Sequence, residues 1–277
     1  MRLLIFGLGY TAGRIATALR ARGWHVTGTS RDGRDDTLAF ADTAAITQEM
    51  ALATHILSSV PPADDRDPVL VSYGALLARS AAWLGYLSST GVYGDAAGAW
   101  VDEGAPLLGR RGARAAADRD WLALGARVFR LPGIYGPGRS ALDRVAEGRA
   151  HRVDLPTQVF SRVHVDDIVA GVLAGLNAAP GAYNLSDDEP CGQNEVIAFA
   201  ALLLGQQPPP FVGLDTLSPM ARAFYAENRR VANLKARRVL GWRPLYPDYR
   251  LGLRALSAMT SPAIASAAPT PASSDQR

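Results

Sequence analysis

Apolar runs and amphipathic segments alternate through the first half of the chain, a pattern typical of parallel βαβ units. The first apolar run, residues 3–6, precedes a segment in which Ile15 and Leu19 recur at helical spacing, and Gly23 separates that segment from a second apolar run. The pattern predicts further elements in turn: strands at residues 25–29, 55–60, 84–89 and 126–131, and helices at residues 70–82 and 113–124. We therefore predict an α/β protein with a Rossmann-type, doubly wound parallel sheet covered by helices on both faces.

The alternation breaks after Gly136, where Pro137 and Gly138 open a loop. Apolar faces at helical spacing then predict three more helices, at residues 142–147, 163–176 and 195–204. We expect residues 1–135, completed by residues 160–185, to form the domain that contains the sheet. Residues 136–160 and 186–259 are expected to form a smaller C-terminal lobe, and the Ala, Ser, Pro and Thr of residues 260–277 predict a disordered tail.

The composition and charge limit the classes of protein to which the chain can belong. With 277 residues, 48% of them hydrophobic, the chain can bury one large core, or one core with a smaller attached lobe. The net charge is +3 and the basic residues are scattered, so we expect no nucleic-acid partner. No apolar run approaches the roughly 20 residues of a membrane span, and the chain begins directly with strand residues. We therefore expect a cytoplasmic protein with no membrane partner. A single cysteine, Cys191, excludes an internal disulfide, and histidines without partners at ligand spacing predict no metal site.

A glycine loop follows the first predicted strand. Gly7 permits a tight turn, Gly9 lets backbone N–H groups approach an anion, and the small Ala12 lets the following helix pack closely on the strand. The start of that helix directs its free N–H groups and the positive end of its dipole toward the same place. This succession of strand, loop and helix predicts a binding site for the pyrophosphate of a dinucleotide cofactor.

The end of the second predicted strand indicates which nicotinamide dinucleotide binds. An acidic residue there accepts a hydrogen bond from the ribose 2′-hydroxyl of NAD, whereas an arginine accommodates the extra phosphate of NADP. Ser30 offers a hydroxyl donor and Arg31 a guanidinium fork, which favour NADP. Asp32 follows closely enough to serve the 2′-hydroxyl if the strand ends later, so NAD stays open as the alternative.

Four further motifs follow the glycine loop in order. They are SSTGVYG at residues 88–94, RLPGIYGPG at residues 130–138, RVHVDD at residues 162–167 and YNLS at residues 183–186. Together with the glycine loop they resemble the extended short-chain dehydrogenase/reductases of the NAD-dependent epimerase/dehydratase family. The ending KARRVLGWRP at residues 235–244 and the short length are most similar to the atypical, YeeZ-like branch of that family.

The resemblance implies a catalytic Ser or Thr, a Tyr and a Lys, in which the phenol exchanges a proton with the substrate and the ammonium lowers the phenol pKa. Ser89 matches the hydroxyl position, but Arg110 and Arg114 stand where the family has Tyr and Lys, and the single lysine of the chain lies in the last motif. An arginine stays charged and cannot act as a general acid or base, so both arginines are expected to stabilise negative charge. By motif, the nearest candidates for the proton donor are Tyr93 and, after it, Tyr135.

The resemblance also implies roles outside this set. His164 and Asp167 match residues that tie a returning segment to the sheet. Phe160 stands where nucleotide-sugar enzymes of the family have an arginine for the diphosphate, which argues against such a substrate, while Arg139 and Arg152 are candidate anion contacts in the small lobe. The full set of predicted cofactor contacts is Gly7, Gly9, Tyr10, Thr11, Ala12, Ser30, Arg31, Ser59 and Pro132.

These observations predict an NADP-dependent, epimerase/dehydratase-like oxidoreductase whose small-molecule substrate lies between the sheet domain and the smaller substrate lobe. The missing Tyr and Lys leave an alternative, a non-catalytic NADP-binding sensor or regulatory protein. A homo-oligomer formed through the helices at residues 70–82 and 113–124 is left open.

Overall fold

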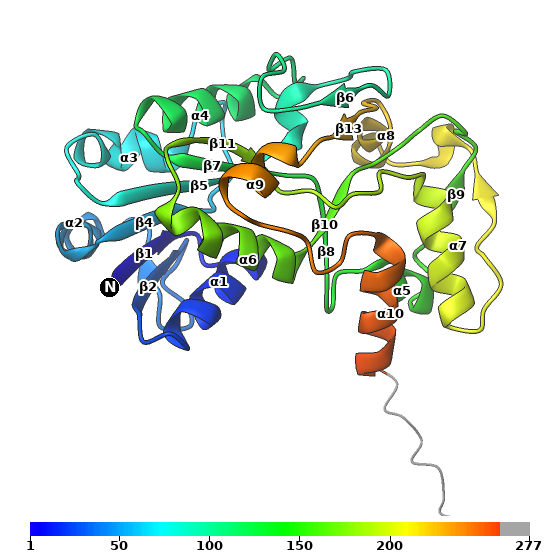
Figure 1. The fold of residues 1–277 in the computed structure, drawn as a ribbon, viewed down its shortest axis with the longest axis horizontal. Helices are drawn as coiled ribbons and strands as arrows, with labels where there is room; N and C mark the ends of the chain where they lie inside the picture. Colours follow the sequence, from blue (N-terminus) through cyan, green and yellow to red (C-terminus); the bar gives the residue numbers. More distant parts are fainter. Residues whose placement is uncertain (261–277) are drawn as a thin grey trace, which may run out of the picture.

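The computed structural model of the protein describes residues 1–260, and its centre is a seven-stranded sheet. Neighbouring strands all pair in parallel, in the order β11-β7-β5-β4-β1-β2-β3 (Figure 1). The strands are β1 (Arg2–Phe6), β2 (His25–Ser30), β3 (Leu38–Ala39), β4 (His55–Ser58), β5 (Trp83–Ser89), β7 (Arg127–Leu131) and β11 (Gly181–Asn184). The order reverses at β1, which confirms the doubly wound Rossmann-type sheet. In sheets of this kind ligands bind outside the carboxyl ends of the strands at the point of reversal, which here lies between β1 and β4.

Helices cover both faces of the sheet because successive residues of a strand point to opposite sides. Leu3 and Ile5 of β1 join one hydrophobic core together with α1 (Tyr10–Arg20) and α6 (Val165–Ala174). Leu4 and Phe6 join a second core on the other face, formed with α2 (Thr43–Leu52), α3 (Pro68–Leu77) and α4 (Gly112–Ala123). The strands and helices predicted for this half are confirmed, with shifts at their ends.

One predicted helix starts later than its apolar pattern indicated. Residues 162–164 form strand β10 (Arg162–His164), which pairs in parallel with β8 (Gly133–Tyr135), and α6 begins at Val165. The His164 side chain caps the helix, because its Nδ1 accepts a hydrogen bond from the backbone N–H of Asp166 at 3.2 Å. The prediction of a helix from residue 163 was therefore wrong at its start, since the buried Val163 belongs to a strand pair.

A smaller body lies beside the sheet, to the right in Figure 1. Its helices α5 (Ala141–Ala146), α7 (Gln193–Leu203) and α10 (Tyr249–Thr260) share a separate hydrophobic cluster that includes Leu142, Ile197 and Leu253. The remaining elements are two short strand pairs, three single-turn helices and two short α-helices: β6 (Trp100–Val101) with β13 (Arg230–Val231), β9 (Arg152–Val153) with β12 (Phe211–Val212), η1 (Thr90–Tyr93), η2 (Gly175–Asn177), η3 (Leu214–Thr216), α8 (Pro219–Phe224) and α9 (Leu234–Val239). Of the predicted tail, Thr260 ends α10 and the rest lies outside the described residues.

The C-terminal segment is tied to the sheet half through Asp167. Its carboxylate accepts hydrogen bonds from the backbone N–H groups of Leu245 at 2.6 Å and Tyr246 at 3.1 Å, and its backbone oxygen accepts one from Trp242 Nε1 at 3.0 Å. Burial raises the pKa of Asp167 to about 6. Asp167 therefore has the tying contacts that the motif implied. No helix within residues 1–260 is long and apolar enough to cross a bilayer, and these residues contain no group of three or more metal-ligating side chains.

Candidate functional site

The glycine loop joins β1 to α1 at the carboxyl edge of the sheet. Gly7 adopts φ +81°, and its backbone N–H donates a hydrogen bond to Thr29 Oγ1 at 3.1 Å. A Cβ atom at this position would lie 2.9 Å from Val60 Cγ2. Both the backbone angle and the close approach of the chain after β4 therefore require glycine at position 7.

Gly9 sits directly before α1 with an ordinary φ of −98°, so its own conformation does not demand glycine. A Cβ atom there would meet no other atom within 4 Å. No side chain caps α1, and its first turn, which includes the buried Thr11 and Ala12, contains no acidic residue. The first-turn N–H groups of α1 thus have no capping side chain among the described residues, at the place where the loop predicts an anion.

Two further predicted cofactor residues lie around this loop. Tyr10 reaches from α1 to the loop after β8, where its hydroxyl donates a hydrogen bond to the Pro137 oxygen at 3.1 Å. Ser59 follows β4, and its backbone N–H donates to the Phe6 oxygen at 2.8 Å. Both therefore stand at the carboxyl edge of the sheet, next to the loop.

Ser30, at the end of β2, bonds to residues of the turn that follows and so differs from its predicted role. Its Oγ accepts hydrogen bonds from the backbone N–H groups of Gly33 at 2.9 Å and Arg34 at 3.1 Å, and its hydroxyl contacts Asp32 Oδ1 at 3.2 Å. Ser30 thus organises the turn, which corrects the expectation of a free hydroxyl donor for a phosphate. The Arg31 side chain is exposed and forms no hydrogen bond or ion pair with any described residue, so its guanidinium is free.

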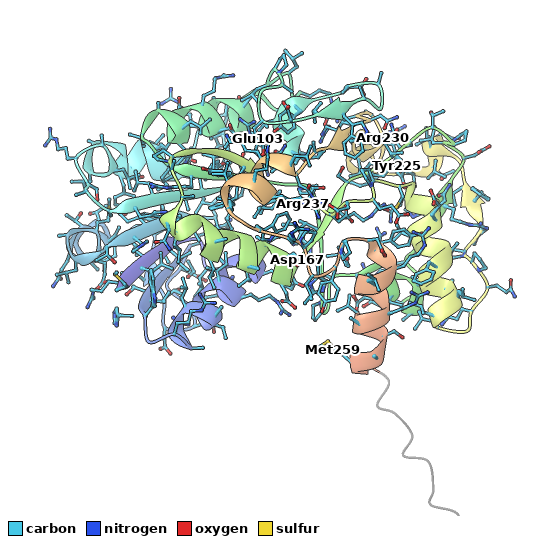
Figure 2. All side chains as sticks on the ribbon, viewed as in Figure 1. Glu103, Asp167, Tyr225, Arg230, Arg237 and Met259 are labelled. Carbon is cyan, nitrogen blue, oxygen red and sulfur yellow. The ribbon has the colours of Figure 1, made fainter. Side chains whose placement is uncertain are left out.

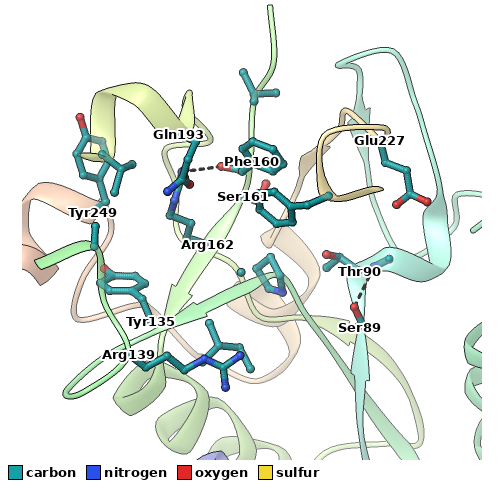
Figure 3. Close-up of a pocket in the computed structure, with 18 of the residues that line it drawn as sticks. Ser89, Thr90, Tyr135, Arg139, Phe160, Ser161, Arg162, Gln193, Glu227 and Tyr249 are labelled. Carbon is teal, nitrogen blue, oxygen red and sulfur yellow. Dashed lines mark hydrogen bonds between the residues drawn. The ribbon is translucent and has the colours of Figure 1, made fainter. Parts of the chain in front are cut away.

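A cavity of about 860 Å³ lies at the same edge of the sheet, between the sheet and the smaller body. Its lining includes Ser89 at the end of β5, Pro132 after β7, Arg110 and Arg114. Figure 3 shows Ser89 in the wall of this cavity. The structure therefore brings together three of the four predicted catalytic residues and one predicted cofactor contact.

Ser89 is half-buried in the cavity wall. Its Oγ accepts a hydrogen bond from the backbone N–H of Gly91 at 3.1 Å and thereby caps η1. Because the oxygen is the acceptor in that bond, the hydroxyl proton is left to donate into the cavity. Ser89 is therefore placed to bind an oxygen of a substrate.

Tyr93 lies outside the cavity, which corrects the expectation that it donates a proton there. Its side chain is 2% exposed, its hydroxyl donates to Asn184 Oδ1 at 2.7 Å, and it accepts from Arg130 Nη1 at 3.0 Å. Burial raises the pKa of Tyr93 to about 12. Tyr135 does line the cavity, but it is buried and its pKa is raised by burial and by the nearby Asp187.

The two arginines at the family's Tyr and Lys positions have different surroundings. Arg110 donates from Nε to Glu227 Oε1 at 3.0 Å and from Nη2 to the Ala223 oxygen at 2.6 Å, so it holds the segment around α8 over the cavity. Arg114 lines the cavity half-buried, and its guanidinium forms no hydrogen bond or ion pair with the residues that the structure describes. Of the two, Arg114 is therefore the one whose guanidinium is available to bind a ligand.

A buried ion pair fixes α4, and with it Arg114, against the sheet. Arg130 of β7 donates from Nε and Nη2 to both carboxylate oxygens of Asp118 on α4, at 3.0 and 2.7 Å. Ser88 of β5 adds a hydrogen bond from its hydroxyl to Asp118 Oδ2 at 2.6 Å. These bonds connect α4 to the two strands whose ends carry Ser89 and Pro132.

Arginines dominate the lining of the cavity. There are eight of them, against the two carboxylates of Asp143 and Glu227, and the eight are Arg110, Arg111, Arg114, Arg139, Arg144, Arg149, Arg162 and Arg229. The candidate anion contact Arg139 is among them. The other candidate, Arg152, is not, because it packs over the Phe211 ring and donates to the Pro209 oxygen.

Sequence reasoning missed several cavity residues that come from the smaller body. Arg144 on α5, and Glu227 and Arg229 before β13, belong to no motif of the first half. Arg229 donates to Glu227 Oε2 at 2.8 Å and to the Gly94 oxygen at 2.7 Å, and so lies close to the loop after Ser89. The one available signal was the dominance of arginine, since Lys235 is the only lysine among 29 basic residues.

Proteins of known structure share this fold. MoeE5, solved with UDP-glucuronic acid and NAD, matches with a TM-score of 0.76 at 20% identity over 94% of this chain and 99% of that one. Human epimerase family protein SDR39U1, solved with NADPH, matches with a TM-score of 0.71 at 16% identity over 93% and 99%. The chain therefore shares the fold of these two proteins.

Two relatives have a higher sequence identity to this chain, although no family model matches the sequence. A functionally unknown conserved protein from Silicibacter pomeroyi is 44% identical, with a TM-score of 0.86 over 93% of this chain and 98% of that one. Protein YeeZ of Escherichia coli K12 is 28% identical over 89% of this chain and 97% of its own length. The chain is therefore similar to Protein YeeZ over most of its length, which supports the predicted resemblance to the YeeZ-like branch.

A further relative matches only part of the chain. The 3-diazoavenalumate denitrifying reductase of a Streptomyces species is 33% identical over 142 residues, which are 47% of this chain and 46% of that protein. The chain thus matches less than half the length of this reductase.

Proposed function

We propose that the protein is an NADP-dependent, epimerase/dehydratase-like oxidoreductase that acts on a small metabolite in the cavity next to Ser89. One observation carries this proposal. The N-terminus of α1 has no capping side chain among the described residues, and a Cβ atom on Gly9, directly before it, would meet no other atom within 4 Å. This N-terminus lies at the same edge of the sheet as the cavity. Known proteins with this fold support a nicotinamide dinucleotide, since MoeE5 was solved with NAD and SDR39U1 with NADPH. The division into a sheet domain and a substrate lobe, and a cytoplasmic location, belong to the same proposal.

The glycine loop fits the pyrophosphate of such a cofactor. Its backbone N–H groups at the start of α1 are free of side-chain caps, and Gly9 leaves room for phosphate oxygens to approach them. When bound, the nicotinamide supplies or accepts the hydride. The chain itself has to position the substrate and stabilise the charge that develops on it.

Two cavity residues serve that purpose in the proposal. The Ser89 hydroxyl donates a hydrogen bond to the reacting oxygen, and the free guanidinium of Arg114 stabilises the negative charge that this oxygen gains. Tyr93 is committed to Asn184 and Arg130, so water in the cavity is the proposed carrier of the proton. Arg110, already bonded to Glu227, holds the α8 segment that covers the site.

Replacing Ser89 by alanine should slow hydride transfer by about 100-fold, the loss expected when one donor to a developing oxyanion is removed. Stopped-flow absorbance of bound NADPH, mixed with a panel of carbonyl compounds, measures this rate. Ser89→Thr keeps the hydroxyl and serves as the control, with a rate close to that of the native protein. An unchanged rate in Ser89→Ala would remove Ser89 from the reaction.

Replacing Arg31 by alanine should weaken NADPH binding by about 10- to 100-fold and leave NADH binding unchanged, because only NADPH carries the phosphate that this guanidinium would bind. Calorimetric titration of both nucleotides measures the two affinities. The control is Arg34→Ala, which removes another exposed guanidinium of the same turn, one that lies 3.7 Å from Asp35. Tighter binding of NADH than of NADPH to the native protein would overturn the choice of cofactor.

The second candidate function is an NADP-binding sensor without turnover. It is favoured by one observation, that the residue at the family's Tyr position, Arg110, is bonded to Glu227 and Ala223, while Tyr93 is buried. A cell extract distinguishes the two functions. If NADPH binds tightly but no metabolite of the extract oxidises it, the sensor is supported and the oxidoreductase is not.

A further inference from the structure

The positive charge of the cavity is not neutralised by its own carboxylates. Asp143 Oδ2 accepts hydrogen bonds from the backbone N–H and the hydroxyl of Ser140, both at 2.6 Å, and so caps α5. Glu227 is shared between Arg110 and Arg229. Both acidic side chains that line the cavity are therefore engaged, and among the residues that the structure describes most of its eight arginines have no carboxylate partner.

Arg162 is the most deeply buried of these arginines, with 6% of its surface exposed. Within the described part of the chain its guanidinium donates to neutral acceptors only: the Phe160 oxygen at 2.9 Å, Cys191 Sγ at 3.1 Å and oxygen at 3.3 Å, and Gln193 Oε1 at 3.0 Å. Asp187 lies nearby, and burial raises the pKa of its carboxyl while the charge of Arg162 lowers it. The guanidinium of Arg162 thus lies in a poorly solvated place among neutral hydrogen-bond acceptors.

Arg144 adds a second charge at the same end of the cavity. It is half-buried on α5, and its guanidinium forms no hydrogen bond or ion pair within residues 1–260. Burial lowers the pKa of Arg144, and the charges of Arg162 and Arg149 lower it further, while Tyr225 acts in the opposite direction. A ligand anion is stabilised where several guanidinium groups repel one another at a cavity wall, because it relieves that repulsion.

The wall between this end and Ser89 is aromatic. Phe160 and Phe224 stack with ring centroids 4.3 Å apart and an angle of 10° between their planes, and both rings line the cavity. Figure 3 shows Arg162, Gln193 and Tyr249 on one side of the cavity and Ser89 and Thr90 on the other, with Phe160 between them. A ligand that reaches from Arg162 to Ser89 must therefore pass an apolar surface.

We propose that the substrate is a small organic acid whose carboxylate or phosphate is bound by Arg144 and Arg162, whose apolar body lies against Phe160 and Phe224, and whose reacting group faces Ser89. This inference rests on the proposed function and names its substrate class. The anionic group is held away from the reacting atoms, so Arg144 and Arg162 act as substrate-binding residues.

Calorimetric titration of the native protein with three probes tests the inference: cinnamate, phenyl phosphate and the neutral cinnamamide. Cinnamate or phenyl phosphate should bind at least 10-fold more tightly than cinnamamide, and the tighter of the two acids identifies carboxylate or phosphate as the preferred group. Equal affinities for cinnamate and cinnamamide, with phenyl phosphate binding no more tightly, would overturn the proposal.

The variant Arg144→Met tests the assigned residue, because this side chain has no bonds within the described structure to lose. It should weaken binding of the preferred acid by at least 10-fold and leave the thermal midpoint unchanged or raised, since a repelled charge is removed. Arg119→Met, on the exposed face of α4, is the control and should change neither quantity, since this side chain has no bonds within the described structure either. Unchanged acid binding in Arg144→Met would overturn the assignment.

These outcomes separate the inference from the proposed function. If the acids bind as expected but no substrate oxidises NADPH, the anion site stands and the oxidoreductase fails. If a neutral carbonyl compound oxidises NADPH while no acid binds, the oxidoreductase stands and the anion site fails.

Discussion

Replacing Gly9 by valine is expected to weaken NADPH binding at least 100-fold, or about 2.7 kcal/mol, without unfolding the protein. In the structure Gly9 has an ordinary φ of −98°, and a Cβ atom there would meet nothing within 4 Å. A side chain at this position therefore conflicts with no part of the chain itself. It would occupy the space through which a pyrophosphate reaches the N–H groups of α1.

Two neighbouring glycines provide the controls for this experiment. Gly13→Ala lies within α1, where a Cβ atom also meets nothing within 4 Å, and should leave both NADPH affinity and stability close to native. Gly7→Ala should instead lower the stability, because a left-handed φ of +81° costs an alanine about 1–2 kcal/mol. Calorimetry with NADPH and thermal unfolding separate the three variants. Native affinity in Gly9→Val would show that no pyrophosphate approaches this loop.

Replacing Arg130 by methionine is expected to lower the free energy of unfolding by about 3–5 kcal/mol, the typical loss when one partner of a buried ion pair is removed. Arg130 and Asp118 are 3% and 0% exposed. Although burial alone disfavours the charged arginine, its bonds to Asp118 raise its pKa. The variant leaves the Asp118 carboxylate buried without its counter-charge, and it also removes a donor to the Tyr93 hydroxyl.

The matched control is Arg14→Met, which breaks an ion pair of similar length near the surface. Arg14 lies 3.2 Å from Asp166, and the two side chains are 35% and 48% exposed, so its removal should change the stability by less than about 1 kcal/mol. Urea unfolding of both variants measures the difference. Equal midpoints for the two variants would contradict a stabilising role for the buried pair, and with it the fixed position of α4 and Arg114.

The sequence alone determined five of the seven strands, most helices and the glycine loop of the sheet half, because local patterns specify them. Leu3 to Phe6 are apolar at every position, as a strand buried on both faces requires, and Gly7 and Gly9 stand at fixed distances from its end. The start of α6 was mispredicted because a long-range strand pairing overrides the local pattern there. Val163 extends the apolar residues of that helix toward the N-terminus, but pairing with β8 holds Val163 and His164 in a strand.

Only the tertiary structure decided which residues surround the cavity. Ser30 and Tyr93 carry hydroxyls that suit their predicted roles. In the folded chain, however, Ser30 bonds within a turn, and Tyr93 bonds to Asn184 and Arg130. Arg144 and Arg162 are 18 residues apart and lie on different elements, and their shared surroundings arise from the packing of α5 and β10 around one space. Local sequence specifies which element a side chain is on, whereas the charge balance of a cavity depends on long-range packing that no periodicity encodes.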